Sequence, residues 1–232
     1  MPNHVETELT ITGNQKSLNA FEKKHLIPRH NDTDGDYIEF DFNTIVPMPE
    51  ELKDTRSPAP QTLKDAEQVF CMDGNEEDKL RIKEKQIAQF HNKDQYIKRF
   101  GANNWYDWSI KHWGTKWGAY SANYSKEKGL IHISYQTAWS PATPVLEKLH
   151  EMYPNLVFEQ QVLDEGMGFG GTQTWDKEGY SEVFYEGTDL MNFCNEYFGY
   201  NYSECPDCGE MYCQDWIDDD MNKDLCEECN QK

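Results

Sequence analysis

The chain has 232 residues, enough for one well-formed hydrophobic core with a small added module. It carries 42 acidic and 22 basic residues, which gives a formal net charge of −20 at pH 7. A general nucleic-acid-binding protein needs a cationic surface that displaces counterions from phosphates, so this charge argues against that class. It argues equally against binding to an anionic membrane. Basic protein surfaces and cationic ligands are the favoured partners, although solubility alone also explains the charge.

The cysteine content and the absence of long apolar runs indicate a cytosolic protein. No apolar run approaches the roughly 18 residues that a membrane span needs, and the first residues lack the basic and apolar regions of a secretory signal. Seven cysteines are present, five of them between Cys205 and Cys229. This clustering suits a metal site in a reducing compartment better than a disulfide framework.

The first 27 residues predict a strand followed by a helix. Apolar and polar residues alternate from Val5 to Ile11, as in a half-buried strand, and Gly13 ends the pattern. Residues 14–27 then place apolar positions at a helical period. These positions are Leu18, Phe21, His25 and Leu26.

The next segment predicts a second strand and then a helical insertion. Alternation of Ile38, Phe40 and Phe42 with acidic residues predicts the strand, which Pro47 and Pro49 end. From about residue 50 to 112 the chain is charged and helical in period, and Gly101 is expected to end its long helix. The apolar stripe of that helix consists of Leu80, Ile87, Phe90 and Ile97.

The second half of the chain alternates strands with helices and ends in a cysteine-rich tail. Expected strands cover 119–124, 130–139 and 155–166, an amphipathic helix 141–153, and a hairpin turns at 176–179. The order contains two strand–helix–strand halves, which favours an α+β ferredoxin-like sheet with helices on one face. We expect a domain over residues 1–200 and an acidic zinc-ribbon-like module over 201–232.

Five ordered segments between residue 3 and about residue 171 carry a family resemblance. They are NHVETELTITG, IVPMPEEL, WGTKWGAY, YQTAWSPATPVLEKLHEMYPNLVFE and DEGMGFGG. Together they resemble the YubB ferredoxin-like family, small proteins carried by bacteriophages, prophages and conjugative plasmids. The resemblance implies a ferredoxin-like fold without iron–sulfur chemistry and an origin on a mobile element, but it implies no activity. The insertion and the cysteine tail are the places where this chain departs from the family's core pattern.

The tail predicts a four-cysteine zinc site. Two Cys-x2-Cys knuckles have the spacing of a zinc ribbon, and Pro206 and Gly209 suit the tight turn of the first knuckle. The predicted ligands are Cys205, Cys208, Cys226 and Cys229. Four thiolates leave no open coordination position, so a structural zinc ion is expected. Cys213 is an alternative ligand with poorer spacing, while Cys71 and Cys194 are interpreted as core or free thiols.

The charge of the tail makes it a poor nucleic-acid reader. Residues 204–232 contain ten acidic residues against Lys223 and Lys232. Phosphates would be repelled at contact distance. The acidic run DWIDDD lacks the spaced ligands and the glycine of a calcium loop, so a solvated loop is the simpler interpretation.

A tryptophan-rich segment supplies a second candidate site. Bulky rings beside glycines suit the wall of a groove for a small molecule or a partner. The candidate groove residues are His112, Trp113, Lys116, Trp117, Thr137 and Trp139. The alternative is that these tryptophans complete the core between the insertion and the sheet, and the sequence leaves both interpretations open.

Catalytic motifs are absent from the sequence, which contains no Gly-x-Ser-x-Gly, His-Glu-x-x-His or phosphate-binding glycine loop. The first hypothesis is therefore a non-enzymatic accessory protein of a phage or other mobile element that binds a host protein in the host cytosol. Inhibition of a host-defence component is one form of it. The alternatives are an acidic DNA mimic, and a small-molecule-binding protein or enzyme that uses the tryptophan groove.

Overall fold

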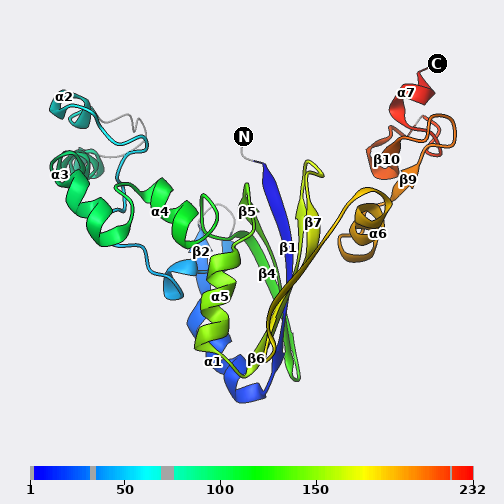
Figure 1. The fold of residues 1–232 in the computed structure, drawn as a ribbon, viewed down its shortest axis with the longest axis horizontal. Coiled ribbons are helices and arrows are strands. Elements are labelled where there is room, and N and C mark those ends of the chain that lie inside the picture. Colours follow the sequence, from blue (N-terminus) through cyan, green and yellow to red (C-terminus); the bar gives the residue numbers. More distant parts are fainter. Residues whose placement is uncertain (1–2, 32–34, 69–75, 220, 232) are drawn as a thin grey trace.

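A six-stranded antiparallel sheet forms the centre of the molecule in the computed structural model, which describes residues 3–31, 35–68, 76–219 and 221–231 (Figure 1). The spatial order of its strands is β4-β5-β1-β6-β7-β8. Their bounds are β1 His4–Gly13, β4 Tyr120–Glu127, β5 Leu130–Ala138, β6 Leu156–Asp164, β7 Gly170–Asp176 and β8 Gly179–Tyr185. Helices α1 (Gln15–His25) and α5 (Thr143–Met152) cover one face of this sheet (Figure 1).

The connectivity of the central elements is ferredoxin-like. The chain runs β1-α1-β4-β5-α5-β6, and β1 pairs antiparallel with both β5 and β6. Each strand–helix–strand unit is thus split by a strand of the other unit, which defines this motif. The β7–β8 hairpin extends the sheet beyond β6. The predicted α+β class, with helices on one face of the sheet, is confirmed.

The main core lies between the sheet and helices α1 and α5. Alternate residues of β1 point toward the helices, so Leu9 and Ile11 are fully buried, as is Phe158 of β6. They pack in one cluster with Phe21 of α1 and Leu146 of α5. Because the period of each predicted stripe matches its element, the sequence located this core correctly.

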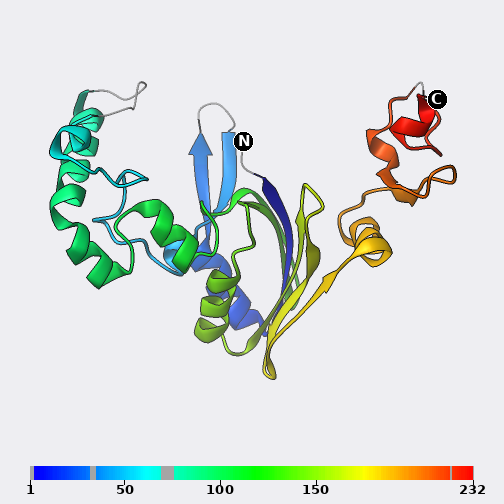
Figure 2. The same cartoon turned by 45° about the horizontal axis from the view of Figure 1, so that its top comes forward.

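The predicted second strand is real but does not join the large sheet. Strand β3 (Gly35–Phe40) pairs with β2 (Leu26–Asn31) in a separate two-stranded sheet, which projects beside the large sheet and contacts it where β3 meets β4 (Figure 2). Leu26 therefore begins a strand and does not end the helix, since Pro28 two residues later prevents helical continuation. The second strand of the first ferredoxin-like half is instead β4.

The predicted strand extends too far toward Pro47, because the alternation of apolar and polar residues continues beyond the end of β3. Phe42 lies in a short 3-10 helix, η1 (Phe42–Thr44), and not in β3. Phe40 and Phe42 are both buried in the main core, one from a strand and the other from this turn. The alternation of apolar residues therefore identified side chains that contact the core, but these side chains do not belong to one continuous strand.

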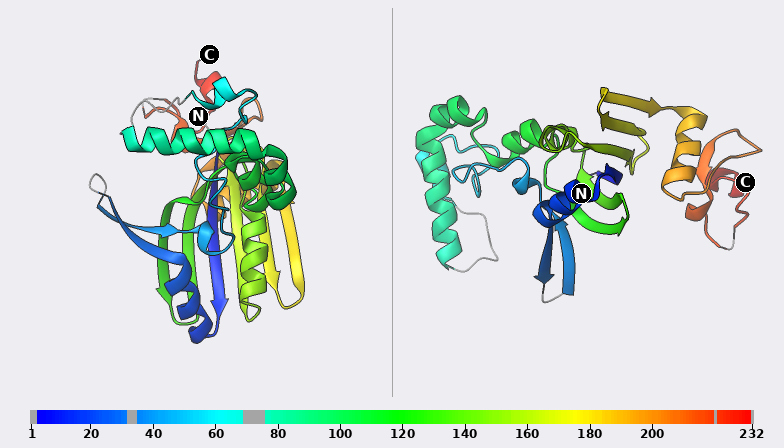
Figure 3. Two further views of the ribbon diagram at one scale, coloured as in Figure 1. Left: turned by 90° about the vertical axis from the view of Figure 1, so that its left-hand side faces the viewer. Right: turned by 90° about the horizontal axis from the view of Figure 1, so that it is seen from below.

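The insertion is helical, as predicted, and lies at one end of the molecule (Figure 3). It contains α2 (Leu63–Ala66), α3 (Glu76–Phe100) and α4 (Trp105–His112). Gly101 follows α3 with a positive φ of 76°, the conformation of a helix-terminating glycine. The predicted stripe of α3 is wrong at its two ends, because Leu80 and Ile97 are exposed, whereas Ile87 and Phe90 are half-buried. The buried face instead carries Gln89, whose amide donates to the carbonyl oxygens of Arg56 and Asn103.

The C-terminal segment lies at the opposite end of the sheet from the insertion (Figure 3). It contains α6 (Gly187–Tyr197), β9 (Tyr202–Glu204), β10 (Met211–Cys213), the 3-10 helix η2 (Gln214–Trp216) and α7 (Glu227–Asn230). Gly170 of β7 permits close docking of α6, since an added Cβ would lie 2.5 Å from Leu190 Cδ1. No described helix is both long enough and apolar enough to cross a membrane.

Candidate functional site

The four predicted ligand cysteines converge in the C-terminal segment. The Sγ atoms of Cys205, Cys208, Cys226 and Cys229 all lie within 4.8 Å of one another. The Sγ atoms of Cys208 and Cys226 are 3.6 Å apart. A tetrahedral zinc–thiolate site, with Zn–S bonds of about 2.3 Å, places its sulfurs about 3.8 Å apart. The arrangement therefore fits a single metal ion enclosed by four thiolates.

The backbone shapes the first knuckle around Cys205. Its N–H donates to the carbonyl oxygen of Glu210 at 2.8 Å, and its own carbonyl accepts from Gly209 N–H at 2.8 Å. Gly209 has a φ of 73°, the left-handed conformation that a glycine adopts without strain. The Cys226 N–H points at Cys205 Sγ from 3.5 Å and lowers the pKa of that thiol to about 6. Preformed N–H donors of this kind favour the thiolate that a metal requires.

The neighbouring thiols raise the pKa of Cys229, the fourth cysteine of the cluster. The hydrogen bond with Cys208, followed by burial, raises the pKa of Cys229 to about 12. Four neighbouring thiols cannot all ionise without a compensating charge. A divalent cation supplies that charge, so the donor set fits a bound ion better than four free thiols.

The remaining described cysteines lie outside the cluster. Cys213 is buried and its Sγ lies 3.8 Å from an Asp215 carboxylate oxygen. Cys194 of α6 is fully buried, 3.9 Å from the sulfur of Met167, and burial raises its pKa to about 11. Both belong to an apolar cluster between α6 and β10. Cys71 lies outside the described residues.

Three of the six predicted groove residues pack tightly against their neighbours. Trp113 is 6% exposed, and its indole N–H donates to Val46 O at 2.9 Å. Thr137 is fully buried and donates to Ser140 O at 2.8 Å. His112 stacks on the ring of Trp108, with 4.7 Å between ring centroids. These contacts support the alternative that part of the aromatic set completes the core.

The other three residues are accessible but do not form one site. Trp117 is 39% exposed, with Lys116 Nζ 4.4 Å from the centre of its ring. Trp139 is half exposed and has a positive φ of 74°. An open cavity of about 430 Å³ brings Trp113 and Trp117 together with Phe42, Tyr120 and two acidic residues, Glu39 and Asp41. Of the six predicted residues, only these two tryptophans line it.

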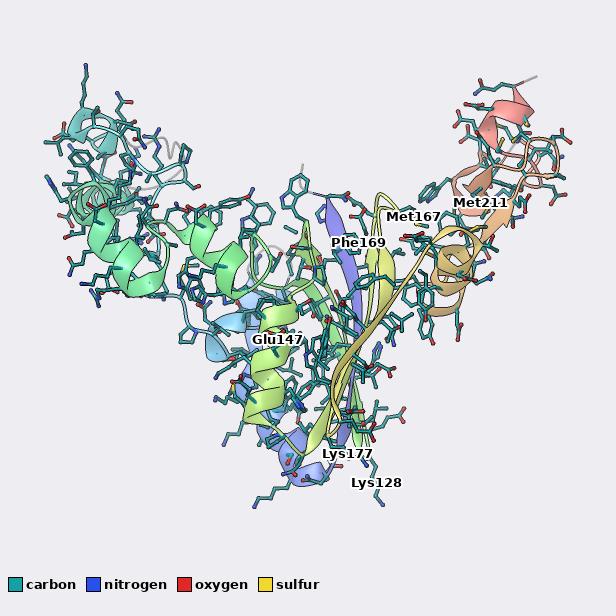
Figure 4. The ribbon with its side chains drawn as sticks, in the orientation of Figure 1. Lys128, Glu147, Met167, Phe169, Lys177 and Met211 are labelled. Carbon is teal, nitrogen blue, oxygen red and sulfur yellow. The ribbon has the colours of Figure 1, made fainter. Side chains whose placement is uncertain are left out.

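A second cavity was not foreseen from the sequence. It has a volume of about 420 Å³ and lies between α6 and the cysteine-bearing segment. We call it the methionine groove, and its principal apolar lining residues are Met167, Leu190, Met191, Met211, Trp216 and Ile217. Figure 4 shows Met167 and Met211 at this end of the molecule. Trp216 within the acidic run DWIDDD was the available signal, because it places a large aromatic ring among carboxylates.

The sheet face opposite α1 and α5 carries a polar pair that the sequence did not single out. His132 Nε2 lies 3.1 Å from a carboxylate oxygen of Glu8. Burial, together with the nearby Glu6, raises the pKa of Glu8 to about 7. Tyr200, which precedes β9, donates to Glu6 at 3.1 Å. This pair can hold or exchange a proton, and Ser134, which lies opposite Glu8 in β5, lines a shallow pocket together with Glu6 and Glu8.

Comparison with known proteins supports the ferredoxin-like assignment. Residues 113–193 match a family model described as the ferredoxin-like domain in Api92-like protein. The matched segment covers β4 to β8 and part of α6. A crystal structure of protein Api92 from Yersinia pseudotuberculosis is similar with a TM-score of 0.45 and 9% sequence identity, over 81% of this chain and 99% of that chain. The search of curated proteins found no match.

Proposed function

We propose that this chain is a non-enzymatic binding protein that docks a partner protein at the methionine groove. The observation that carries the proposal is the exposed apolar lining of this groove. Trp216 is 63% exposed and Met211 is 40% exposed. Large apolar side chains that gather around a groove on a highly charged protein are typical of a protein-interaction site.

A structural zinc ion in the four-cysteine cluster forms part of the proposal. Met211, Trp216 and Ile217 lie in the chain between the two cysteine knuckles. A metal that joins Cys208 to Cys226 therefore fixes the segment that forms one wall of the groove. The closed donor set supports a structural and not a catalytic role for the ion.

The biological setting is the finer part of the proposal. The motif resemblance to the YubB family supports a phage or mobile-element accessory protein, acting on a host protein in the host cytosol. Inhibition of a host-defence component is a specific form of this function. The net charge of −20 also supports a DNA mimic, but lysines and arginines interrupt the acidic residues along α3.

Crosslinking and capture from a lysate of the host bacterium test this function. Trp216→Ala removes an exposed groove residue, and Trp139→Ala removes a comparably exposed tryptophan outside the groove. We expect one partner to be captured by the wild type and by Trp139→Ala, and to be lost with Trp216→Ala. Equal capture by all three proteins, or capture of none, contradicts the proposal.

The tryptophan cavity supports a second candidate function, the binding of a small organic cation. Trp117 and Tyr120 line this cavity, and Asp41 provides negative charge beside Glu39, which is ion-paired with Arg29. Lys116 Nζ lies 4.4 Å from the centre of the Trp117 ring, a cation–π contact that a ligand cation would replace. Loss of tetramethylammonium binding in Trp117→Ala, measured by calorimetry, would support this function, and no binding to the wild type would exclude it.

A further inference from the structure

We propose that the methionine groove is a receptor for a basic amphipathic helix, with apolar residues on one face and lysine or arginine residues flanking them. This inference rests on the proposed function, because it specifies the chemistry of the partner segment that the groove accepts. It follows from the apolar lining of the groove and from the charge that surrounds it.

The lining of the groove suits an apolar helical face. Three methionines reach it from separate elements: Met167 from the β6–β7 loop, Met191 from α6 and Met211 from β10. Methionine side chains are unbranched and polarizable, so they adapt to apolar side chains of different shapes. Trp216 supplies a large, rigid and accessible ring beside them. Grooves that accept amphipathic helices combine these two types of residue.

The charge around the groove selects a cationic partner. From Glu186 to Gln231 the sequence contains thirteen acidic residues and a single basic one, Lys223. That lysine is already paired with Asp219 at 2.7 Å. Glu227 lines the groove itself. A zinc ion with four thiolates would add a net charge of about −2 to this end of the molecule.

The positive residues of the sheet lie elsewhere. Figure 4 shows Lys128 and Lys177 at the end of the sheet opposite Met167 and Met211. An apolar groove that includes Glu227 and lies in so acidic a part of the chain therefore favours an occupant that brings positive charge with its apolar face. A second copy of this chain would bring another acidic surface, and a nucleic acid or an anionic lipid would be repelled in the same way.

Titration of the intact zinc-loaded protein with synthetic helical peptides tests the inference. The probe is an amphipathic peptide of about 18 residues built from leucine and lysine. One control replaces every lysine by glutamate, and another keeps the composition but scrambles the leucine spacing. Signals of the methionine methyl groups report the location of binding. We expect the leucine–lysine peptide to shift the signals of Met167, Met191 and Met211, while Met48 and Met152, which pack against the main core, stay unchanged.

Matched variants separate the apolar contribution from the charge contribution. Trp216→Ala should weaken binding of the leucine–lysine peptide at least about tenfold, as expected for a central aromatic contact. Glu227→Lys should weaken it about three- to tenfold and reduce its salt dependence. Glu147→Lys makes the same charge change at an exposed position of α5, far from the groove (Figure 4), and should leave the affinity unchanged.

Three results would overturn the inference. They are equal affinity for the lysine and glutamate peptides, equal affinity for the scrambled peptide, and methyl shifts confined to residues outside the groove. Shifts of Met211 that depend on protein concentration without peptide would identify a second copy as the occupant and would also overturn it. If Trp216→Ala loses the lysate partner while the peptides fail, the proposed function stands and only the chemistry assigned to the partner is wrong. If Trp216→Ala retains the lysate partner, the proposed function itself fails.

Discussion

Replacement of one buried ligand, Cys226→Ser, should unfold the cysteine-bearing segment without unfolding the sheet. The apolar cluster inside this segment consists of Cys205, Tyr212, Ile217 and Cys226. Tyr212 and Ile217 are its large buried side chains, and the half-buried Met221 and Leu225 pack against it. Full burial contributes about 1.5–3 kcal/mol for a large apolar side chain and half burial about half of that, so these four side chains contribute at most about 9 kcal/mol. This is smaller than the roughly 10–16 kcal/mol by which zinc stabilises small four-ligand domains. A bound zinc ion would therefore be the dominant stabilising contribution in this segment.

Metal analysis combined with hydrogen exchange measures this effect. The wild type should contain about one zinc ion per chain and Cys226→Ser none. Amide protection should then disappear from β9 and β10, whereas β1 and β5 keep theirs because their ladder does not involve this segment. Cys213→Ala is the control: it replaces a buried cysteine outside the cluster and should retain the metal. Protection of β10 that survives loss of the metal would refute the reasoning, because packing would then hold the segment.

Three further predictions concern the main domain. Burial lowers the pKa of His25 to about 4, so protonation favours the unfolded chain, and about 2 kcal/mol of stability should be lost between pH 7.5 and pH 5. Urea unfolding of His25→Leu should lack that pH dependence. Glu8→Gln should unfold at higher urea than the wild type at pH 8 but not at pH 4, because the raised pKa of Glu8, about 7, makes its ionised form unfavourable in the fold. Since Glu8 is partly exposed, a gain of about 1–2 kcal/mol is expected. Gly171→Ala should lower the thermal midpoint by an amount equivalent to about 1–3 kcal/mol, because the added Cβ would lie 2.3 Å from Val183 O; an unchanged midpoint would show that β8 can move away.

The fold was predictable wherever one side of an element contacts the core. Val5 to Ile11 alternate because one face of β1 packs on α1 and α5, and the sequence shows this directly. The prediction failed for α3, where Gln89 is fully buried and Leu80 is exposed. A glutamine whose amide satisfies two backbone carbonyl oxygens occupies a buried position that hydrophobic periodicity assigns to an apolar residue. The strand β2 was missed because Pro28 and the charged residues after it lack a half-buried pattern.

The candidate sites were predictable only where neighbours in sequence form them. The cysteine cluster followed from two short spacings, because each knuckle places its own pair of sulfurs. The methionine groove did not, since Met167, Met191 and Met211 are separated by at least twenty residues and meet only through the docking of α6. The tryptophan set divides between core and surface, because Trp113 and Thr137 are buried while Trp139 is half exposed. Trp113 and Trp117 are one helical turn apart in sequence, yet one supports the core and the other faces solvent.

The two additions to the ferredoxin-like frame are joined to it at points that leave its hydrogen-bond ladders intact. The helical insertion occupies the connection between α1 and β4, and the cysteine-bearing segment follows the β7–β8 hairpin. Neither interrupts the continuous register of β1 with β5 and β6. Either addition can therefore change its length or surface without altering the alignment of the central strands. In this architecture the sheet is a common support for two additions that lie at its opposite ends.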